Sequence, residues 1–294
     1  MLSKDPVRLE RVRIVESLIE KINEAVSGVK RNELGVAFSG GVDSSVLAAS
    51  CKDQGKNISL LTVGFSSLRD VEASMEASEK MGLNLIYEVV SLDDLEDGIK
   101  SVLKVIEFDR LVLLENSVCF YYVFKIASQH GIGTVLSANG MDELFCGYDL
   151  YRKYSDDEKR TREIMSMLVE TAKRDKMEID KIADLWNVNY ECPFLSDSFV
   201  DFAIKISLEY KIKGKDDEMR KHILREAALK MGVPRSAAMR KKKAFQYSSG
   251  IHKTIEKLAK LRGYTKGKAK ALGYSGPIEA YIKHHFLRRK STRK

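Results

Sequence analysis

Residues 35–47 read Gly-Val-Ala-Phe-Ser-Gly-Gly-Val-Asp-Ser-Ser-Val-Leu, and this stretch decides the fold. It predicts an apolar strand, a short turn with two glycines, and the immediate start of a helix. Gly40 and Gly41 let the backbone turn tightly and bring its N–H groups up to a phosphate. Ser44 and Ser45 add hydroxyl donors in the first helical turn, where the helix dipole favours negative charge. The stretch therefore predicts a phosphate-binding loop.

A carboxylate in the same turn points to a divalent cation. Asp43 would repel a phosphate unless a cation lay between them, and Mg²⁺ binds one or two carboxylates together with phosphate oxygens. The turn lacks the Gly-Lys-Ser/Thr of a Walker loop and the Gly-x-Gly-x-x-Gly of a dinucleotide-binding fold. A plain turn between a strand and a helix is the alternative. The order of strand, Ser39-Gly-Gly-x-Asp-Ser and helix favours a magnesium–nucleotide site.

Hydrophobic periodicity predicts alternating strands and helices over the first half of the chain. The predicted strands end at Phe38, Gly64, Val90 and Ser137, and the predicted helices cover residues 7–29, 46–52, 71–81, 92–105 and 117–129. This alternation is typical of an α/β fold with a Rossmann-like parallel sheet, whose ligands bind beyond the carboxyl ends of the strands. The residues expected at those ends are Phe38, Ser39, Val63, Gly64, Ser137 and Ala138.

The second half of the chain reads differently. After Tyr154 the pattern predicts helices and loops, with no strand, and no repeat or low-complexity linker divides the sequence. We therefore expect a single domain over residues 1–294. Residues 1–150 would form its α/β ATP-binding core, and residues 151–294 a mostly helical part that packs against the sheet.

Residues 136–148, Leu-Ser-Ala-Asn-Gly-Met-Asp-Glu-Leu-Phe-Cys-Gly-Tyr, repeat the scheme of strand, glycine turn and acidic residues. Asp142, arriving from a second strand end, would complete a two-carboxylate magnesium site that neutralises a pyrophosphate leaving group. Taken alone, the pair Asp142-Glu143 at a helix start is more often a favourable cap for the helix dipole. Coupled to the first loop, the pair favours the metal site.

Together these segments resemble the synthetase domain of asparagine synthetase, which belongs to the ATP pyrophosphatase, or PP-loop, superfamily. The resemblance continues through Pro193-Phe-Leu, Lys221-His-Ile-Leu-Arg-Glu and Arg240-Lys-Lys with Phe245. The blocks follow the family order from the N-terminal helix to about Gly250. Related enzymes split ATP between the α and β phosphates and adenylate a substrate, and the same domain occurs in β-lactam synthetases. The resemblance thus implies an adenine nucleotide α-hydrolase-like core that uses ATP and Mg²⁺.

The resemblance also assigns roles to individual residues. It implies a catalytic group made of Asp142, Glu143, Lys221 and Arg240, with Asp43 and Asp142 as metal ligands. It implies a nucleotide site made of Phe38, Ser39, Gly40, Gly41, Asp43, Ser44, Ser45, Val63, Gly64, Ser137, Ala138, Gly140 and Lys242. Lys221 would stabilise phosphate charge, a task that suits a compact point charge. Glu107 and Asp109 fall in the region that shapes the acceptor pocket.

Three departures from the family pattern limit what the resemblance implies. The chain starts at the helix before the first strand, so we expect no glutaminase activity in this polypeptide and nitrogen from ammonia, an amine or a separate glutaminase subunit. Asn139 stands where the family has a glutamate, and an amide cannot act as a base near neutral pH. Cys146 replaces a glycine, and Cys192 replaces an arginine before Pro-Phe-Leu.

Charge is distributed unevenly along the chain. Residues 235–294 hold 18 basic and 2 acidic residues, whereas the whole chain has a net charge of only +8. Such a segment could bind RNA by neutralising phosphates. A solvated lysine-rich face is the alternative.

The cysteine pattern and hydropathy suggest an intracellular protein. The four cysteines are scattered without a Cys-x-x-Cys pair, which favours reduced thiols over a zinc or iron–sulfur site. The five histidines show no metal-ligand spacing. No signal peptide or membrane-spanning segment is predicted, so we expect a cytoplasmic protein with no membrane contact.

Three functions remain open on the sequence alone. The first is an ATP-dependent ligase that adenylates a small-molecule carboxylate and forms an amide with ammonia or an amine, as asparagine synthetase does. The second is a PP-loop enzyme that modifies RNA or tRNA through an adenylated intermediate. The third is a nucleotide-binding scaffold without catalysis, which Asn139 would permit but Asp43, Asp142 and Lys221 disfavour.

Overall fold

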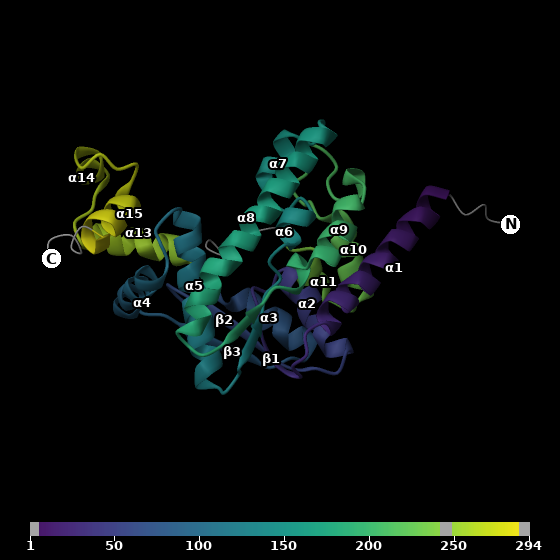
Figure 1. Ribbon diagram of the computed structural model, residues 1–294, viewed down its shortest axis with the longest axis horizontal. Helices are drawn as coiled ribbons and strands as arrows, with labels where there is room; N and C mark the ends of the chain where they lie inside the picture. Colours follow the sequence, from purple (N-terminus) through teal and green to yellow (C-terminus); the bar gives the residue numbers. More distant parts are fainter. Residues whose placement is uncertain (1–5, 242–248, 288–294) are drawn as a thin grey trace.

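A five-stranded parallel sheet forms the centre of the computed structural model, which describes residues 6–241 and 249–287 (Figure 1). The strands are β1 (Glu33–Ala37), β2 (Asn57–Gly64), β3 (Leu85–Val89), β4 (Thr134–Leu136) and β5 (Asn189–Glu191), in the order β3-β2-β1-β4-β5. Val36 of β1 lies in register with Leu60 of β2 and Leu136 of β4. The first loop and the second acidic segment therefore leave neighbouring strands at the same edge of the sheet. The expected α/β Rossmann-like class is confirmed.

The expectation of no strand after Tyr154 is wrong. Strand β5 adds residues 189–191 to the sheet by parallel pairing with β4, with Val135 opposite Tyr190. Its sequence, Asn-Tyr-Glu, has too few residues and too little alternation to stand out, because a short edge strand buries only its middle side chain. The second half of the chain thus contributes directly to the central sheet.

Helices connect and cover the strands. The α-helices are α1 (Pro6–Ser27), α2 (Val42–Asp53), α3 (Glu72–Met81), α4 (Leu92–Val105), α5 (Leu111–Gln129), α6 (Met141–Leu144), α7 (Asp149–Lys153), α8 (Glu158–Asp184), α9 (Asp197–Lys205), α10 (His222–Lys230), α11 (Arg235–Ala238), α13 (Ile251–Leu261), α14 (Lys266–Ala271) and α15 (Pro277–Ala280). Short 3-10 turns are η1 (Leu68–Asp70), η2 (Pro193–Leu195) and η3 (Leu208–Tyr210), and η4 (Tyr281–Leu287) is a π-helix. Helix α2 begins directly after Gly41, four residues before the predicted start.

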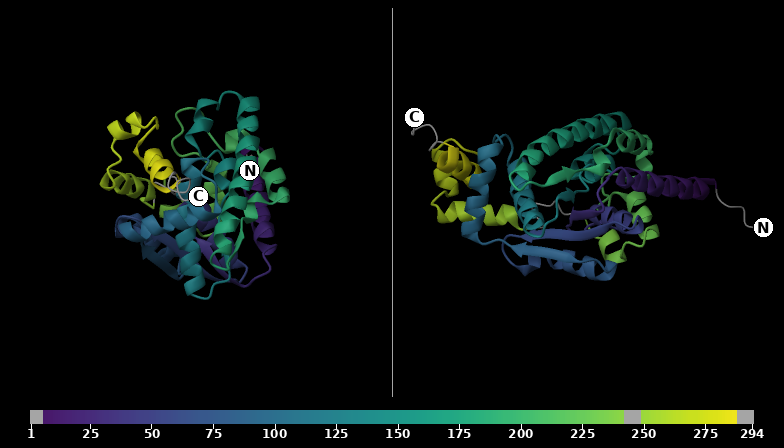
Figure 2. Two further views of the ribbon diagram at one scale, coloured as in Figure 1. Left: turned by 60° about the vertical axis from the view of Figure 1, so that its left-hand side comes forward. Right: turned by 60° about the horizontal axis from the view of Figure 1, so that its bottom comes forward.

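Alternate residues of the strands face two separate cores. Val36 and Leu60 pack with side chains of α1, α2 and α10, whereas Leu61 and Val63 pack with α4 and α5. Both faces of the sheet are covered, as expected for parallel strands rich in apolar residues. The views in Figure 2 show α1 at one end of the molecule and α13 to α15 at the other.

Helix α5 is long and apolar enough to cross a membrane when judged by length and composition alone. However, 67% of its apolar window is buried inside the protein. Val118 and Phe124 are fully buried in the core cluster that also holds Leu61 of the sheet. The apolarity of α5 is therefore explained by its position against β2.

The C-terminal helices are tied to the end of β2 and to α4 and α5. The N–H of Phe65 donates to the Ser249 carbonyl at 2.9 Å, and His252 Nδ1 lies 2.6 Å from the buried Glu115 carboxylate. On the far side, Tyr281 donates its hydroxyl to Glu96 of α4 at 2.8 Å. These contacts hold the lysine-rich α13 at a fixed place on the molecule.

A buried lysine lies in the second half of the chain. Lys211 is fully buried, and its Nζ donates to the Ala203 carbonyl at 2.6 Å and lies 5.7 Å from the Phe145 ring centre. Burial lowers the pKa of Lys211 from 10.5 to about 7, because the ammonium form is desolvated and no carboxylate of the described residues pairs with it. The charged form is therefore costly to the folded state.

We expect Lys211→Met to change how stability depends on pH. Between pH 7 and 10.5 the unfolded chain binds a proton that folded Lys211 releases, so the free energy of unfolding rises with pH across this window. The Met variant lacks this slope and should exceed the parent most at pH 7 and below, with the gap shrinking toward pH 10. Urea unfolding across this range measures the difference. Parallel curves, or the same change in the exposed control Lys213→Met, would contradict the assignment.

Candidate active site

The first loop folds tightly between β1 and α2. Gly40 has φ 66°, and a Cβ there would lie 2.3 Å from the Ala73 carbonyl oxygen, so only glycine fits. The N–H of Ser39 donates to Ser44 Oγ at 3.2 Å, which folds the turn back onto the start of α2. Ser45 is fully buried, and its hydroxyl has no partner within the described chain. This arrangement leaves backbone N–H groups and a hydroxyl at the start of a helix, as phosphate binding requires.

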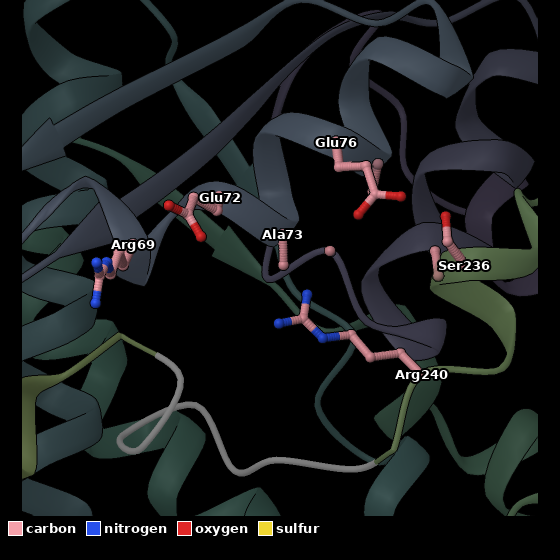
Figure 3. Close-up of a pocket in the computed structure, with 9 residues that line it drawn as sticks. Arg69, Glu72, Ala73, Glu76, Ser236 and Arg240 are labelled. Atoms are coloured by element: carbon pink, nitrogen blue, oxygen red, sulfur yellow. The ribbon is translucent and has the colours of Figure 1, made fainter.

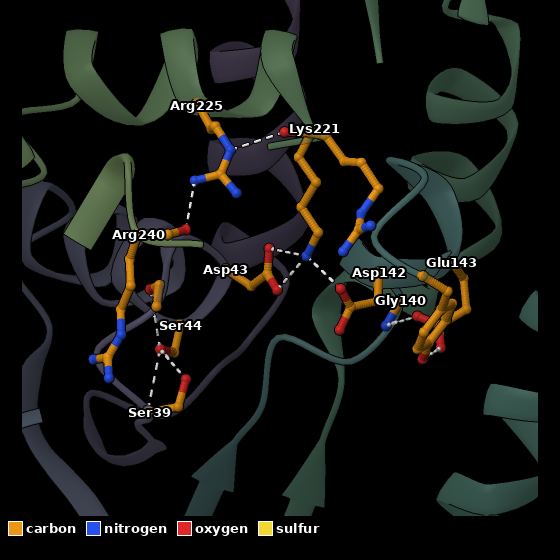
Figure 4. A network of polar contacts seen from close by, with 12 residues as sticks. Ser39, Asp43, Ser44, Gly140, Asp142, Glu143, Lys221, Arg225 and Arg240 are labelled. Carbon is orange, nitrogen blue, oxygen red and sulfur yellow. Dashed lines mark hydrogen bonds and ion pairs between the residues drawn. The ribbon is translucent and has the colours of Figure 1, made fainter. Parts of the chain in front are cut away.

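Lys221 joins the two acidic segments (Figure 4). Its Nζ lies 2.6 and 2.8 Å from the two carboxylate oxygens of Asp43 and 2.5 Å from Asp142 Oδ1. The lysine side chain is fully buried, whereas the carboxylates keep 20% and 17% of their surface exposed. Burial alone would lower the pKa of Lys221, but the carboxylates outweigh it and raise the pKa. Lys221 is therefore a permanent cation whose partners face solvent.

The backbone that presents Lys221 is strained. Arg220 and Lys221 have φ 50° and φ 56°, in the left-handed region that favours glycine, directly before α10. The buried Arg225 guanidinium donates to the carbonyls of Met219 and Arg220 on this turn, both at 2.8 Å. Burial raises the pKa of Asp217, but N–H bonds from Arg220 and Lys213 and the His222 ring bring it to about 2. Arg225 and Asp217 therefore hold the turn that presents Lys221.

Arg225 also holds a second segment. It donates to the carbonyls of Ala238 and Arg240 at 2.6 and 2.9 Å. The predicted site residue Arg240 therefore shares its support with Lys221. Lys242 and Phe245, which the resemblance also implicates, lie outside the described residues.

The two carboxylates of the second acidic segment, Asp142 and Glu143, have different partners. Asp142 faces Lys221, whereas Glu143 accepts the Gly140 N–H at 3.1 Å and the Tyr148 hydroxyl at 2.6 Å. Gly147 closes this turn so tightly that a Cβ would lie 2.0 Å from Asp142 Oδ1. Glu143 thus caps α6 and Gly147 makes room for Asp142.

Comparison with known proteins shows to which family this chain belongs. The family model for asparagine synthase matches residues 17–178 and 153–293, which together cover most of the chain. The chain belongs to the asparagine synthase family. A Methanocaldococcus jannaschii protein provisionally named as a glutamine-hydrolysing asparagine synthetase is 28% identical over 80% of the chain and 49% of that protein. Asparagine synthetase B of Escherichia coli is 29% identical over 74% of the chain and 41% of that enzyme.

The chain spans about half the length, or less, of these curated relatives. Among solved structures, the NMN synthetase of Francisella tularensis resembles it with a TM-score of 0.43 and 14% identity, covering 97% of this chain and 96% of that one.

The residues that depart from the asparagine synthase pattern lie in or next to the candidate site. Cys146 has φ 58°, a conformation that glycine adopts without strain, and burial raises the pKa of its thiol to about 11. Asn139 Nδ2 donates to the Tyr190 hydroxyl at 3.0 Å, and that hydroxyl lies 2.7 Å from Ser137 Oγ. All four cysteines are buried and free. The site therefore includes Tyr190 of β5, which sequence reasoning missed together with its strand.

Several of the predicted nucleotide-binding residues have buried side chains, so only their backbone groups could contact a nucleotide. The side chains of Phe38 and Val63 are buried in the two cores, and Phe38 accepts the Ser74 hydroxyl with its carbonyl at 3.2 Å. Glu107 and Asp109 do not join the Lys221 cluster; they line a surface groove of about 660 Å³ against α8. The phosphate loop, Asp43, Asp142 and Lys221 are the predicted residues that the structure brings together.

The oxygen donors at this cluster suit magnesium. Two carboxylates converge from neighbouring strand ends, and no group of three or more potential His, Cys, Asp or Glu ligands occurs in the described part of the chain. Mg²⁺ needs only one or two carboxylates when phosphate oxygens and water complete its octahedron. Asp43 and Asp142 would hold it, and the unpartnered Ser45 hydroxyl lies in the same loop.

Gly147→Ala should disrupt the Asp43–Lys221–Asp142 cluster, although Gly147 itself is not part of it. The new methyl group would lie 2.0 Å from Asp142 Oδ1 and 2.5 Å from Lys221 Cε, so both side chains must move. We expect the free energy of unfolding to fall by roughly 1–3 kcal/mol, the usual cost of overpacking. Urea unfolding tests this, with Gly133→Ala as the matched control because a Cβ there meets nothing within 4 Å. Equal effects of the two substitutions would refute the close-packing argument.

Proposed function

We propose that this chain is an ATP-dependent ligase that adenylates a carboxylate and converts it to an amide. One observation carries the proposal: the Asp43–Lys221–Asp142 cluster lies beside a glycine loop at the carboxyl edge of a parallel sheet. Such a site binds a polyphosphate next to a fixed positive charge. Membership of the asparagine synthase family supports the same chemistry.

The proposed first half-reaction transfers AMP to the substrate. The substrate carboxylate attacks the α-phosphorus of ATP, and the bond to the bridging oxygen breaks so that pyrophosphate leaves with the electron pair. Backbone N–H groups of residues 39–45 would hold the pyrophosphate, and the Lys221 ammonium would stabilise the developing negative charge. When bound by Asp43 and Asp142, Mg²⁺ supplies further electrostatic stabilisation of the leaving group.

The proposed second half-reaction forms the amide. Nitrogen attacks the acyl carbon and displaces AMP, and aspartate with ammonia, free or from a separate glutaminase, is the substrate pair we propose first. Asn139 orients this end of the site by its bond to Tyr190 but cannot accept a proton. The attacking nitrogen must therefore arrive unprotonated.

ATP–pyrophosphate exchange with a panel of carboxylates, including aspartate, tests the proposal. We expect exchange with the parent chain and its loss in Asp43→Asn, which removes the charge that faces Lys221. Asp53→Asn, at the exposed end of the same helix, should keep the parent rate. Parent-level exchange in Asp43→Asn would refute the site assignment. Absence of exchange with every carboxylate, with ammonia present, would favour a nucleotide-binding scaffold.

We also propose, as a second candidate function, that the C-terminal helices bind RNA. Lys253, Lys257 and Lys260 recur at helical spacing on one face of α13, and Lys266 and Lys270 do so on α14. All five are exposed, and Lys253 and Lys257 form no ion pair within the described residues. A row of exposed lysines, of which Lys260 is paired with Glu256, favours a ligand with regularly spaced phosphates.

A double substitution tests this surface. Lys253→Glu with Lys257→Glu should lower affinity for a transfer RNA by about tenfold or more at low salt and reduce the salt dependence, because phosphate contacts are lost. Lys205→Glu with Lys213→Glu changes the net charge equally on exposed sites remote from α13 and should have a smaller effect. Fluorescence anisotropy with labelled RNA measures both. Equal losses in the two double variants, or no RNA binding by the parent chain, would exclude this surface.

A further inference from the structure

A histidine and a buried glutamate form a pair where α13 begins. His252 Nδ1 lies 2.6 Å from Glu115 Oε1; the Glu115 side chain is 2% exposed, whereas that of His252 keeps 31% of its surface exposed. Burial raises the pKa of Glu115, and the bond to His252 acts in the opposite direction because it favours the carboxylate. When the carboxylate accepts the Nδ1 proton, Nε2 is the basic nitrogen of the neutral ring. The pair thus has the geometry of a general base with its orienting group.

The start of α13 is bound to the carboxyl end of β2. Phe65, the residue after β2, donates its N–H to the Ser249 carbonyl at 2.9 Å and accepts the Thr254 hydroxyl at 3.0 Å. Strand β2 pairs with β1, from which the glycine loop leaves. His252, which lies between Ser249 and Thr254 in the chain, is therefore held at the edge of the sheet where the phosphate loop lies.

The turn η1 connects α13 to the glycine loop itself. A Cβ at Gly250, the N-cap of α13, would lie 2.7 Å from Asp70 Oδ2 of η1. Arg69, the residue before Asp70, lines a pocket of about 320 Å³ together with Gly40 of the loop (Figure 3). The beginning of α13 and the phosphate loop are thus separated by η1 and this pocket.

Helix α5 connects the pair to the Asn139 end of the site. Phe120 packs on the Tyr190 ring with the ring centres 5.1 Å apart, and the Tyr190 hydroxyl accepts from Asn139 at 3.0 Å. Glu115 precedes Phe120 by five residues on the same helix, which is about 7.5 Å along the helix axis. One helix therefore carries both Glu115 and the support of the Tyr190–Asn139 contact.

The groups around His252 favour its protonated form. The titratable groups come from three elements: Glu115 and Cys119 of α5, Glu256 of α13 and Asp70 of η1. Three of the four are carboxyl groups, and burial raises the pKa of the Cys119 thiol, so the fourth stays neutral. Nearby carboxylates stabilise an imidazolium. His252 can therefore hold a proton taken from a substrate.

We propose that His252 is the general base of amide formation and that Glu115 is the residue that positions it. The inference rests on the proposed ligase, whose second half-reaction needs an unprotonated nitrogen that Asn139 cannot supply. His252 Nε2 takes one proton from ammonium, or from a primary ammonium group, and frees the nitrogen lone pair. The nitrogen attacks the acyl carbon, the bond from this carbon to the AMP oxygen breaks with its electron pair on AMP, and a second proton passes from the nitrogen to solvent. The imidazolium, stabilised by the Glu115 carboxylate, then releases its proton to solvent.

Rates of amide formation with two nucleophiles test the proposal, with the carboxylate that gives the fastest ATP–pyrophosphate exchange. At pH 7 ammonia is almost entirely ammonium, whereas hydroxylamine is largely unprotonated and does not need the base. We expect His252→Gln to lower the rate with ammonium by about a hundredfold and to change the rate with hydroxylamine and the exchange rate little. Glu115→Gln should act in the same direction and move the acid limb of the pH profile to lower pH, because the ring loses the charge that raises its basicity.

A matched control and the exchange assay separate the outcomes. His130→Gln, at the other end of α5, should keep all rates. Equal losses with both nucleophiles in His252→Gln and Glu115→Gln, or no loss with either, overturn the inference while exchange still supports the ligase. If His252→Gln also loses exchange, the substitution disturbs the nucleotide half of the site, and the two rates of Glu115→Gln decide. Absence of exchange with every carboxylate in the parent chain rejects the ligase and the base together.

Discussion

A single buried ammonium group connects the parts of this molecule that matter for chemistry. Lys221 bridges Asp43, from the loop after β1, and Asp142, from the turn after β4. Two carboxylates at neighbouring strand ends would repel each other without it, and a fully buried lysine would be costly without them. Each charge is therefore tolerable because the others are in place. The alignment of the two loops depends on this mutual compensation.

Placing Lys221 between the two carboxylates requires a strained backbone conformation. Two successive left-handed residues, Arg220 and Lys221, would not persist unless their surroundings held them, and Arg225 and Asp217 do so by binding the same turn. Arg225 extends this support to Arg240. Lys221 and Arg240 thus share one anchor, the buried Arg225, whose hydrogen bonds within the described residues all go to backbone carbonyls.

The sequence allowed the sheet, the phosphate loop and the acidic pair to be predicted because each has a local signature. Four strand ends fell within one residue of the structure, since apolar runs followed by glycine turns are read directly from spacing. Strand β5 and its residue Tyr190 could not be predicted, because a strand of three residues is too short to show an alternation of apolar and polar side chains.

The two ends of the site differ in the kind of chemistry they support. The Lys221 end is built from fixed charges, because the raised pKa of Lys221 keeps it protonated over the physiological range. The Asn139 end is built from neutral hydrogen bonds: Asn139, Ser137 and Tyr190 form a chain in which burial raises the pKa of Tyr190 well above its usual value. Charge stabilisation belongs to the first end and orientation to the second. Because none of these three groups takes up a proton near neutral pH, amide formation at this end would depend on a nitrogen delivered with its lone pair free.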